Sequence, residues 1–163
     1  MVGTEPRALI LGSLPGEPSI RVNQYYANPR NAFWFIMGEL LGFEPDLPYE
    51  RRIDVVTNAG IALWDVLASA PRDGSLDSAI DSSGAVTNDF VRFFERHPSV
   101  RAVFLNGGTA SDLFAKRVVP ILGAGQEHVR VSLLPSSSPA NTRLTRSEKL
   151  KEWRVILDVL GGT

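Results

Sequence analysis

The sequence predicts an α/β domain in which a mostly parallel sheet is covered by helices on both faces. Residues 8–11 (ALIL) and 102–105 (AVFL) are short, continuously apolar runs, as expected of strands buried on both faces. Each run leads into a glycine-containing segment and then into apolar residues at the three- and four-residue spacing of a helix. Strands that alternate with helices in this way form parallel sheets.

Length and composition narrow the class of protein. A chain of 163 residues, 44% of them hydrophobic, fills one core and is too short for two ordinary domains, so we expect a single domain over residues 1–163. The absence of cysteine excludes a disulfide framework and is compatible with a reducing cytoplasm, where we expect the protein to act. His97 and His128 are too few and too far apart for a histidine metal cluster. No signal peptide is visible, and no apolar run approaches the about 18 residues of a membrane span.

The first apolar run leads into an unusual segment, residues 12–34 (GSLPGEPSIRVNQYYANPRNAFW). We interpret its first part as a loop of about 18 residues, a length that is uncommon in a compact domain unless the loop has a function. The loop leaves the carboxyl end of a parallel strand, where open α/β sheets bind ligands. Gly12 and Gly16 allow its backbone to approach a phosphate or a flat ring closely. An ordinary surface loop with inward-turned aromatic side chains is the alternative.

A helix, a second helix, a strand and a polar excursion are predicted next. Apolar residues recur as on one buried helical face: Phe33, Trp34, Met37, Leu40 and Leu41. Gly42 is placed to end this helix. Residues 51–58 indicate a short helix, and residues 60–67 indicate a strand or a strand followed by a turn. Residues 71–83 are polar and rich in serine and aspartate, which favours an excursion over the surface.

The second half of the chain repeats the strand and helix arrangement. Thr87 or Asn88 can cap a helix that carries apolar residues at positions 90–94 and ends near His97 and Pro98. The apolar run at residues 102–105 predicts a strand, which a glycine turn and another helix follow. Residues 128–134 predict the fourth strand.

The last helix is predicted to begin at a capping box formed by Thr145 and Glu148. Gly161 and Gly162 are placed to close it. The apolar face of this helix contains Leu150, Trp153, Leu157 and Leu160.

Two loops carry the polar residues that can form a functional site. Loops after the first and fourth strands should lie at the same edge of a parallel sheet and face one crevice. The first loop supplies amides and aromatic rings, and the last supplies hydroxyls and an amide. The residues are Asn28, Asn31, Tyr25 and Tyr26 in the first loop and Ser136, Ser137, Ser138 and Asn141 in the last. Neither histidine lies in these loops, which disfavours a serine hydrolase, and the GSLPG glycines match neither a Walker loop nor a dinucleotide fingerprint.

This set of groups suits a nucleobase that has been flipped out of a duplex. A tyrosine can stack on the ring, amides can read its edge, and arginines can hold nearby phosphates. Asp65 can place a carboxylate at the same crevice, and a helix cap is its alternative role. The net charge of −1 gives no overall basic field, so phosphate contacts need a local cluster. The candidates for that cluster are Arg21, Arg30, Arg143, Arg146 and Lys149.

Five motifs, in their order and spacing, resemble those of the uracil-DNA glycosylase superfamily. They are GSLPG, QYYANPRNAFW, GIALWDVL, VFLNG and LPSSSPAN, and the similarity covers residues 9–141. The branch they resemble most is that of the hypoxanthine-DNA (deoxyinosine) glycosylases, followed by the mismatch-specific uracil-DNA glycosylases. The resemblance implies a three-layer α/β/α domain with a short, mostly parallel four-stranded central sheet. It also implies excision without a lysine Schiff base, in which the nucleotide is extruded, the N-glycosidic bond breaks with oxocarbenium character and water adds to the sugar.

The resemblance implies a catalytic role for Asn31. Leu14 stands where most of the superfamily has a water-positioning asparagine or aspartate. In the hypoxanthine branch an asparagine of the NPRNxFW segment takes over, which here corresponds to Asn31. An amide orients water but cannot match the electrostatic effect of a carboxylate, so such a site should work best on bases that leave easily. From the residues alone, Asn31 has an alternative role as the cap of a helix that begins at Ala32.

The resemblance also implies roles for four other residues. Tyr26 falls where mismatch-specific relatives stack an aromatic ring on the flipped base, with core packing as the alternative. Ser138 takes the place of the histidine of other branches, so neutral donors must stabilise the departing base. Arg143 and Leu144 correspond to the loop that enters the duplex, and Leu144 can act as an apolar wedge.

The expected site therefore contains three groups of residues. Catalytic roles are expected for Asn31 and Ser138. The residues expected to bind the base are Gly12, Ser13, Leu14, Tyr26, Trp64, Asp65 and Asn106. The residues expected to contact DNA are Arg30, Ser136, Ser137, Asn141, Arg143 and Leu144. Neither a metal nor an organic cofactor is expected.

We therefore expect a monomeric, monofunctional DNA glycosylase that acts on DNA containing a deaminated base and has no membrane partner. Its expected substrate is hypoxanthine in deoxyinosine, with uracil as an additional one. A mismatch-type uracil-DNA glycosylase with altered catalytic residues is one alternative. A catalytically silent nucleic-acid or nucleotide-binding module of the same fold is another, favoured by the residues at Leu14 and Ser138.

Overall fold

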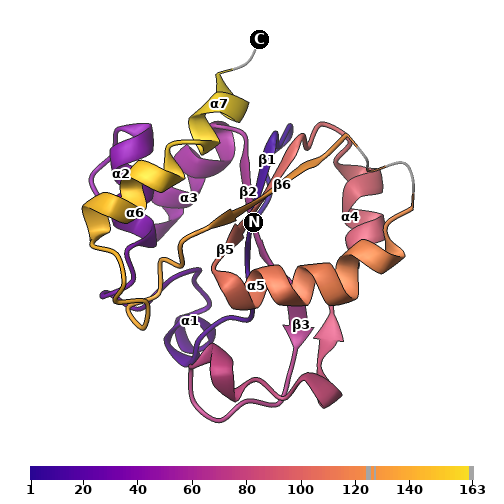
Figure 1. The fold of residues 1–163 in the computed structure, drawn as a ribbon. Helices are drawn as coiled ribbons and strands as arrows, with labels where there is room; N and C mark the ends of the chain where they lie inside the picture. Colours follow the sequence, from indigo (N-terminus) through magenta and orange to yellow (C-terminus); the bar gives the residue numbers. More distant parts are fainter. Residues whose placement is uncertain (124–125, 127, 162–163) are drawn as a thin grey trace.

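The computed structural model describes residues 1–161 except 124, 125 and 127. Its centre is a sheet of four parallel strands in the order β2-β1-β5-β6 (Figure 1). The strands are β1 Ala8–Gly12, β2 Ile61–Asp65, β5 Ala102–Asn106 and β6 Arg130–Leu134. Every residue of β1 and β5 is buried, as the continuous apolar runs predicted. The parallel four-stranded sheet is confirmed, although β6 begins at Arg130 and not at His128.

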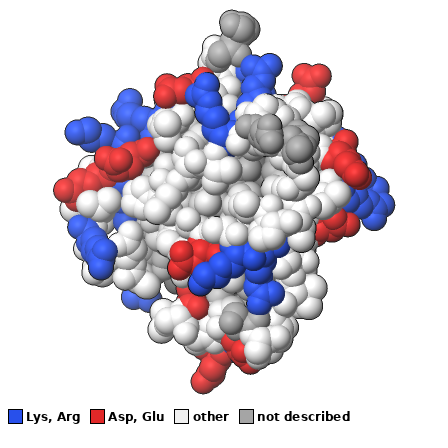
Figure 2. All heavy atoms as spheres, turned by 45° about the vertical axis from the view of Figure 1, so that its right-hand side comes forward, with Lys and Arg blue, Asp and Glu red and all other residues white. Residues whose placement is uncertain are grey.

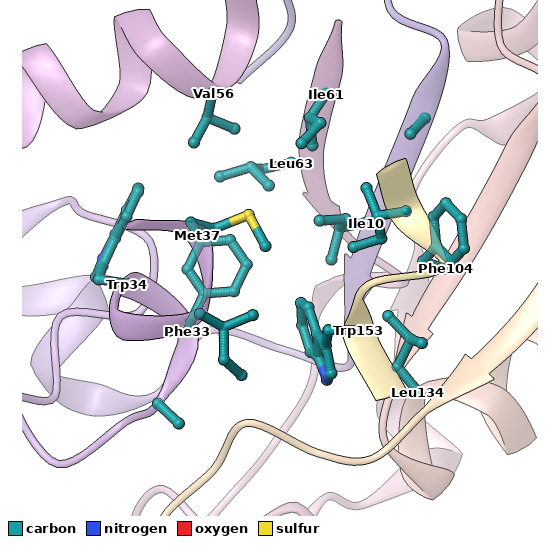
Figure 3. Packing of buried hydrophobic residues seen from close by; sticks show 14 of the residues in the cluster. Ile10, Phe33, Trp34, Met37, Val56, Ile61, Leu63, Phe104, Leu134 and Trp153 are labelled. Carbon is teal, nitrogen blue, oxygen red and sulfur yellow. The ribbon is translucent and has the colours of Figure 1, made fainter. Parts of the chain in front are cut away.

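Four helices cover one face of the sheet: α2 Phe33–Leu41, α3 Tyr49–Asn58, α6 Arg146–Trp153 and α7 Ile156–Leu160 (Figure 1). In this layer Phe33 and Trp153 pack with Ile10 of the sheet (Figure 3). Gly42 ends α2 as predicted, with a φ of 75° that a side chain would strain.

The C-terminal helix differs from the prediction in one respect. The capping box is present, because Thr145 Oγ1 accepts the Glu148 N–H at 3.2 Å and the Glu148 carboxylate accepts the Thr145 N–H at 2.8 Å. However, the helix is interrupted between α6 and α7, and the fully buried residues are Trp153 and Ile156. Gly161 follows α7, while Gly162 lies outside the described residues.

The other face of the sheet packs against α4 Phe90–Arg96, α5 Gly108–Leu113 and a π-helical turn, Phe114–Val118, which leads into the short 3-10 turn Val119–Ile121 (Figure 1). With helices on both faces, the three-layer α/β/α architecture is confirmed. The cap of α4 was predicted wrongly. Asp89 caps the helix by accepting the Arg92 N–H at 3.0 Å, because the preceding residues are used elsewhere.

Those preceding residues belong to a small second sheet. Thr87 lies in β4 Val86–Thr87, which pairs antiparallel with β3 Leu67–Ser69. The segment that was predicted as a strand, or as a strand followed by a turn, is divided into β2 and β3. Asn88 donates its Nδ2–H to the carbonyl of Asp65 at 2.9 Å. Asn88 therefore holds the end of β2 and does not cap the helix.

Two segments predicted to be irregular have definite structure. The first loop contains α1 Glu17–Val22, which ends at Asn23 in the left-handed conformation with a φ of 52°. The excursion contains two 3-10 turns, η1 Asp77–Ala79 and η2 Ser82–Gly84, and it contacts the first loop. Arg72 donates to the carbonyls of Leu14 and Pro15. The excursion lies largely on the surface, as predicted, but its contacts with the first loop were not predicted.

One face of the protein carries charges of both signs (Figure 2). On the face shown in Figure 2, lysine and arginine side chains are interspersed with aspartate and glutamate. This mixture agrees with the net charge of −1. Among the described residues, no helix has the length and apolar character needed to cross a membrane.

Candidate active site

A cavity of about 890 Å³ lies beyond the carboxyl ends of the parallel strands. The first loop and the last loop both line it, as the positions of their strands predicted. Tyr26 and Asn31 come from the first loop, Asp65 and Asn106 end β2 and β5, and Ser138 comes from the last loop. The fold thus brings amide, phenol, hydroxyl and carboxyl groups to one space.

Asn106 joins the two loops. Its Nδ2 donates to the Tyr26 hydroxyl at 3.2 Å and to Ser137 Oγ at 2.9 Å. Its Oδ1 accepts the backbone N–H of Ser137 at 2.8 Å. Both N–H groups of the amide are used in these hydrogen bonds. The buried Asn106 side chain therefore connects the first loop to the last loop.

Tyr26 is held in an unusual backbone conformation. Its φ of 54° lies in the left-handed region, which residues other than glycine rarely adopt and which is often found at functional sites. One face of its ring stacks on Phe33, with centroids 3.8 Å apart and planes 17° apart. Burial raises the pKa of the Tyr26 phenol, the charge of Asp65 raises it further, and the Asn106 hydrogen bond lowers it. Tyr26 therefore stays neutral and packs against the core while lining the cavity.

Asn31 lies directly before α2. Its Oδ1 accepts the Phe33 N–H at 3.0 Å, so the helix begins one residue later than the predicted start at Ala32. This bond satisfies the first N–H of the helix, although the N-cap position itself is Ala32 and has no side-chain cap. Among the residues described, the Nδ2 of Asn31 has no hydrogen-bond partner, and the residue lines the cavity. The bond to Phe33 therefore occupies the amide oxygen and leaves the amide N–H groups available.

Asp65 places a carboxyl group deep in the cavity. Its side chain is only 7% exposed and has no hydrogen-bond partner within the described part of the chain. Burial is the main effect that raises the pKa of this carboxyl to about 7, and the negative charge of Asp77 raises the pKa further. The positive charges of the Met1 ammonium and of Arg72 lower the pKa and oppose this rise. The helix-cap alternative is wrong, since the contact that Asp65 makes at the end of β2 is the one its carbonyl receives from Asn88. Neither oxygen of this carboxyl is both fully buried and unpaired, so the carboxyl can be reached from the cavity by a ligand.

A buried lysine binds the backbone of the loop that follows β6. Lys149 is 4% exposed, and its Nζ donates to the carbonyls of Ser138 at 3.2 Å and Asn141 at 2.9 Å. Burial lowers its pKa, and the charge of Arg146 lowers it further. Lys149 was considered as a phosphate contact, but its ammonium is turned into the protein. It fixes the loop that carries Ser138.

The hydroxyl of Ser138 also has a local role. Its Oγ accepts the Ala140 N–H at 3.2 Å, and its own N–H is donated to Ser136 Oγ at 3.2 Å. Asn141 closes the turn by donating its Nδ2–H to the Ser136 carbonyl at 3.2 Å. The Ser138 hydroxyl keeps its proton available for donation into the cavity.

The sequence matches the model of the uracil DNA glycosylase superfamily over residues 2–160. The chain belongs to this superfamily. The resemblance of the five motifs and the fold that it implied are thereby confirmed. Leu14, at the position where most of the superfamily has an asparagine or aspartate, lines the cavity and packs against the apolar cluster below it.

Two curated relatives are similar to this chain over most of their length. A hypoxanthine DNA glycosylase of Methanosarcina acetivorans is 39% identical over 150 residues, which cover 91% of this chain and 88% of the relative. A hypoxanthine DNA glycosylase of Methanosarcina barkeri is 35% identical over 142 residues, which cover 86% and 84%. The solution NMR structure of a candidate uracil DNA glycosylase from Methanosarcina acetivorans superposes with a TM-score of 0.80 at 33% identity, covering 99% of this chain and 94% of that one.

The glycosylase fold places three of the predicted residues away from the main cavity. Trp64 precedes Asp65 in β2, so its side chain points to the opposite face, where it stacks on Phe93 with centroids 5.0 Å apart. The expectation that Trp64 forms a wall of the pocket is wrong. Arg143 and Leu144 line a neighbouring groove of about 810 Å³.

The remaining predicted residues line the main cavity: Gly12, Ser13, Leu14, Arg30, Ser136, Ser137 and Asn141. Ser136 and Asn141 also line the neighbouring groove, so the two depressions share a wall. Among the described residues, no group of three or more His, Cys, Asp or Glu side chains is placed to hold a metal ion. The cavity offers amide, hydroxyl, phenol and carboxyl groups, together with the guanidinium of Arg30.

Sequence reasoning missed the residues that the excursion contributes. Ser75, Leu76 and Asp77 line the cavity, and Ser13 donates its Oγ–H to Asp77 at 2.6 Å. The excursion has neither the periodicity of a helix nor that of a strand, and its polar composition is typical of a solvated loop. The serine and aspartate content is the only local signal, and it does not indicate which segment these residues face.

Proposed function

We propose that this protein is a monofunctional DNA glycosylase that excises hypoxanthine from deoxyinosine in DNA. The observation that carries the proposal is the buried carboxyl of Asp65, which has no hydrogen-bond partner among the described residues and lies in a cavity also lined by Tyr26 and Asn31. The names of the two Methanosarcina relatives support the same substrate. A second possible substrate is uracil, whose ring is also a product of deamination.

The chemistry of deamination explains why an unpartnered acceptor suits this substrate. In adenine the ring nitrogen next to the amino group is a bare acceptor, whereas in hypoxanthine it carries a hydrogen. Ionised Asp65 can accept that N–H, but it would face a lone pair on adenine. A site with a buried acceptor rejects a base that lacks the matching donor, because the group is then left unpaired.

The excision step assigns a role to each of three side chains. The extruded base lies along the ring of Tyr26, and the amide of Asn31 orients a water molecule toward the sugar. As the C1′–N9 bond breaks, the Ser138 hydroxyl donates a hydrogen bond to the departing base. These three groups carry no net charge, so they lower the reaction barrier by holding the base and the water molecule in fixed orientations. Neither a metal nor an organic cofactor is required for this route.

The groove beside the cavity continues the DNA-binding surface. Arg30 lies at the mouth of the cavity, and Arg143 and Leu144 line the groove. We assign the arginines to phosphates and Leu144 to the gap that the extruded nucleotide leaves in the stack. The monomeric state and the cytoplasmic location expected from the sequence stay predictions.

The test is excision from labelled duplexes that carry a single inosine, uracil or xanthine, followed by alkaline cleavage at abasic sites. We expect cleavage of the inosine strand, and loss of that cleavage in Asn31→Ala. Asn58→Ala is the matched control, because Asn58 is exposed at the end of α3 and does not line the cavity. Cleavage of the uracil strand alone would favour a mismatch-type uracil glycosylase. Binding without any cleavage would favour the catalytically silent module.

A further inference from the structure

The excursion between β3 and β4 carries a carboxylate into the cavity. Asp77 begins the turn η1, is half-buried and lines the cavity. One of its oxygens, Oδ1, accepts the Ser13 hydroxyl at 2.6 Å. Its other oxygen, Oδ2, has no hydrogen-bond partner among the residues that the structure describes. Asp77 therefore has one anchored oxygen and one available oxygen.

The excursion is attached to the first loop at three places. Besides the bond between Ser13 and Asp77, Arg72 donates to the carbonyls of Leu14 and Pro15. The Oγ of Ser75 accepts the backbone N–H of Glu17 at 2.9 Å. These contacts restrict the motion of a segment whose sequence resembles a solvated loop. They also give the Asp77 carboxylate a defined position relative to the cavity.

The charge of Asp77 acts on other groups of the cavity. It contributes to raising the pKa of the buried Asp65 carboxyl and that of the Tyr26 phenol. Asp65 and Asp77 are the two acidic side chains among the described residues that line the cavity. With a pKa of about 7, Asp65 is partly protonated at neutral pH, and its depth suits it to the base. Asp77 is the more exposed of the two acidic side chains and has one available oxygen.

Excision creates positive charge on the sugar, and a neutral amide stabilises that charge poorly. Reactions with oxocarbenium-like transition states commonly place a carboxylate beside the reacting carbon. We propose that the Asp77 carboxylate is the catalytic group that stabilises the developing oxocarbenium ion on the deoxyribose. This inference rests on the proposed glycosylase function.

Asp77 forms no covalent bond and transfers no proton during the reaction. The C1′–N9 bond breaks, and its electron pair leaves with the base, so that the sugar becomes an oxocarbenium ion. The oxygen of a water molecule then adds to C1′. One proton of that water stays on the new hydroxyl, and the other is transferred to the departed base. Asp77 stays ionised throughout and supplies negative charge from a fixed position.

The test is single-turnover excision by Asp77→Asn on the DNA substrate that the wild-type protein cleaves. Asparagine has nearly the same shape and retains an oxygen that can accept the Ser13 hydroxyl, so the variant removes mainly the charge. We expect excision to be about 100-fold slower, the size of effect found for other electrostatic groups in active sites. DNA binding should be equal or tighter, because one negative charge near the phosphates is lost. Asp77→Glu restores the charge and should recover part of the rate.

Two further variants separate a catalytic role from a structural one. Ser13→Ala breaks the bond to Asp77 but keeps the charge, so we expect a loss of only about fivefold or less. Asp73→Asn removes a charge from an exposed site in the same excursion and should change the rate by less than about twofold.

Three outcomes would overturn the inference. If Asp77→Asn excises within about threefold of the wild-type rate, the carboxylate does not act on the sugar. If Ser13→Ala excises the base as slowly as Asp77→Asn, the role of Asp77 is limited to holding the first loop. A wild-type protein that excises no base would overturn the proposed function and this inference together, whereas the first two results leave the proposed function intact.

Discussion

Gly12 lies directly against the carboxyl group of Asp65. The two residues are register partners at the ends of the neighbouring parallel strands β1 and β2. A methyl group at Gly12 would collide with Oδ1 of Asp65 and would lie 3.6 Å from the Tyr26 hydroxyl. The first glycine of the GSLPG motif is therefore needed for space, because a side chain there would displace a buried carboxyl group.

The first prediction concerns this contact. Gly12→Ala should lower the free energy of unfolding by about 1–3 kcal/mol, the usual cost of overpacking, and should slow excision. Urea denaturation and single-turnover excision measure the two effects. Gly108→Ala is the control, because a methyl group there meets no atom within 4 Å. Equal behaviour of the two variants would show that the cavity tolerates the displacement of Asp65.

The second prediction concerns the titration of Asp65. Burial raises its pKa from 3.8 to about 7, so the folded protein holds a proton that the unfolded chain has lost between these values. This difference makes the free energy of unfolding fall as the pH rises from about 4 to about 7. Asp65→Asn removes the titration, so its stability relative to wild type should increase across this window. Denaturation curves at several pH values measure it, and parallel curves for the two proteins would contradict it.

The third prediction separates the two roles of Asn31. Asn31→Ala should lose about 1 kcal/mol of stability, because the oxygen that accepts the first N–H of α2 is removed, and should excise at least about 100-fold more slowly. Asn31→Asp keeps an oxygen for the Phe33 N–H but replaces the available N–H groups with a second acceptor, which can hold water only through the hydrogens of the water, so it should retain the stability and only part of the rate. Thermal unfolding and single-turnover excision provide the comparison. Normal excision by Asn31→Ala would limit Asn31 to its bond with the Phe33 N–H.

The fourth prediction concerns the buried Lys149. Lys149→Met should lower the free energy of unfolding by about 1.5–3 kcal/mol, since two carbonyls lose a charged donor. Hydrogen exchange in the loop around Ser138 should become faster. Lys151→Met, at an exposed position in the same helix, should change neither quantity. Unchanged exchange in Lys149→Met would show that other contacts suffice to hold the loop.

The fifth prediction concerns DNA binding. Arg143 is exposed and lines the groove beside the cavity. Arg143→Ala should weaken binding by a similar factor on all sequences and should reduce the slope of log affinity against log salt by about 1. Binding titrations at several salt concentrations measure both. An unchanged slope would remove Arg143 from the phosphate contacts.

Local patterns predicted the elements well where neighbouring residues decide the structure. The apolar runs of β1 and β5, the helix that ends at Gly42 and the capping box at Thr145 depend on residues within a few positions of one another. Local patterns failed where a competing contact came from elsewhere. Asn88 is a good helix cap by type, but the end of β2 takes its side chain, and Asp89 caps α4.

The site was predictable in its composition and only partly in its arrangement. Tyr26, Asn31 and Asp65 were assigned to one crevice from the topology of parallel strands, and they line one cavity. Trp64 was misplaced because the position of the strand pleat cannot be read from a run that is apolar on both faces. Asp77 was missed because no local pattern connects it to Ser13.

The sequence alone determined the four main parallel strands and most of the helices that cover them, the two loops that carry functional side chains, and the superfamily. These features follow from apolar spacing, from capping residues and from motifs that each lie within a short stretch of chain. The tertiary structure alone decided that Lys149 is buried, that Asn106 joins the loops and that Asp77 enters the cavity. The physical reason is distance along the chain. Ser13 and Asp77 are 64 residues apart, and only the packing of the whole fold brings them together.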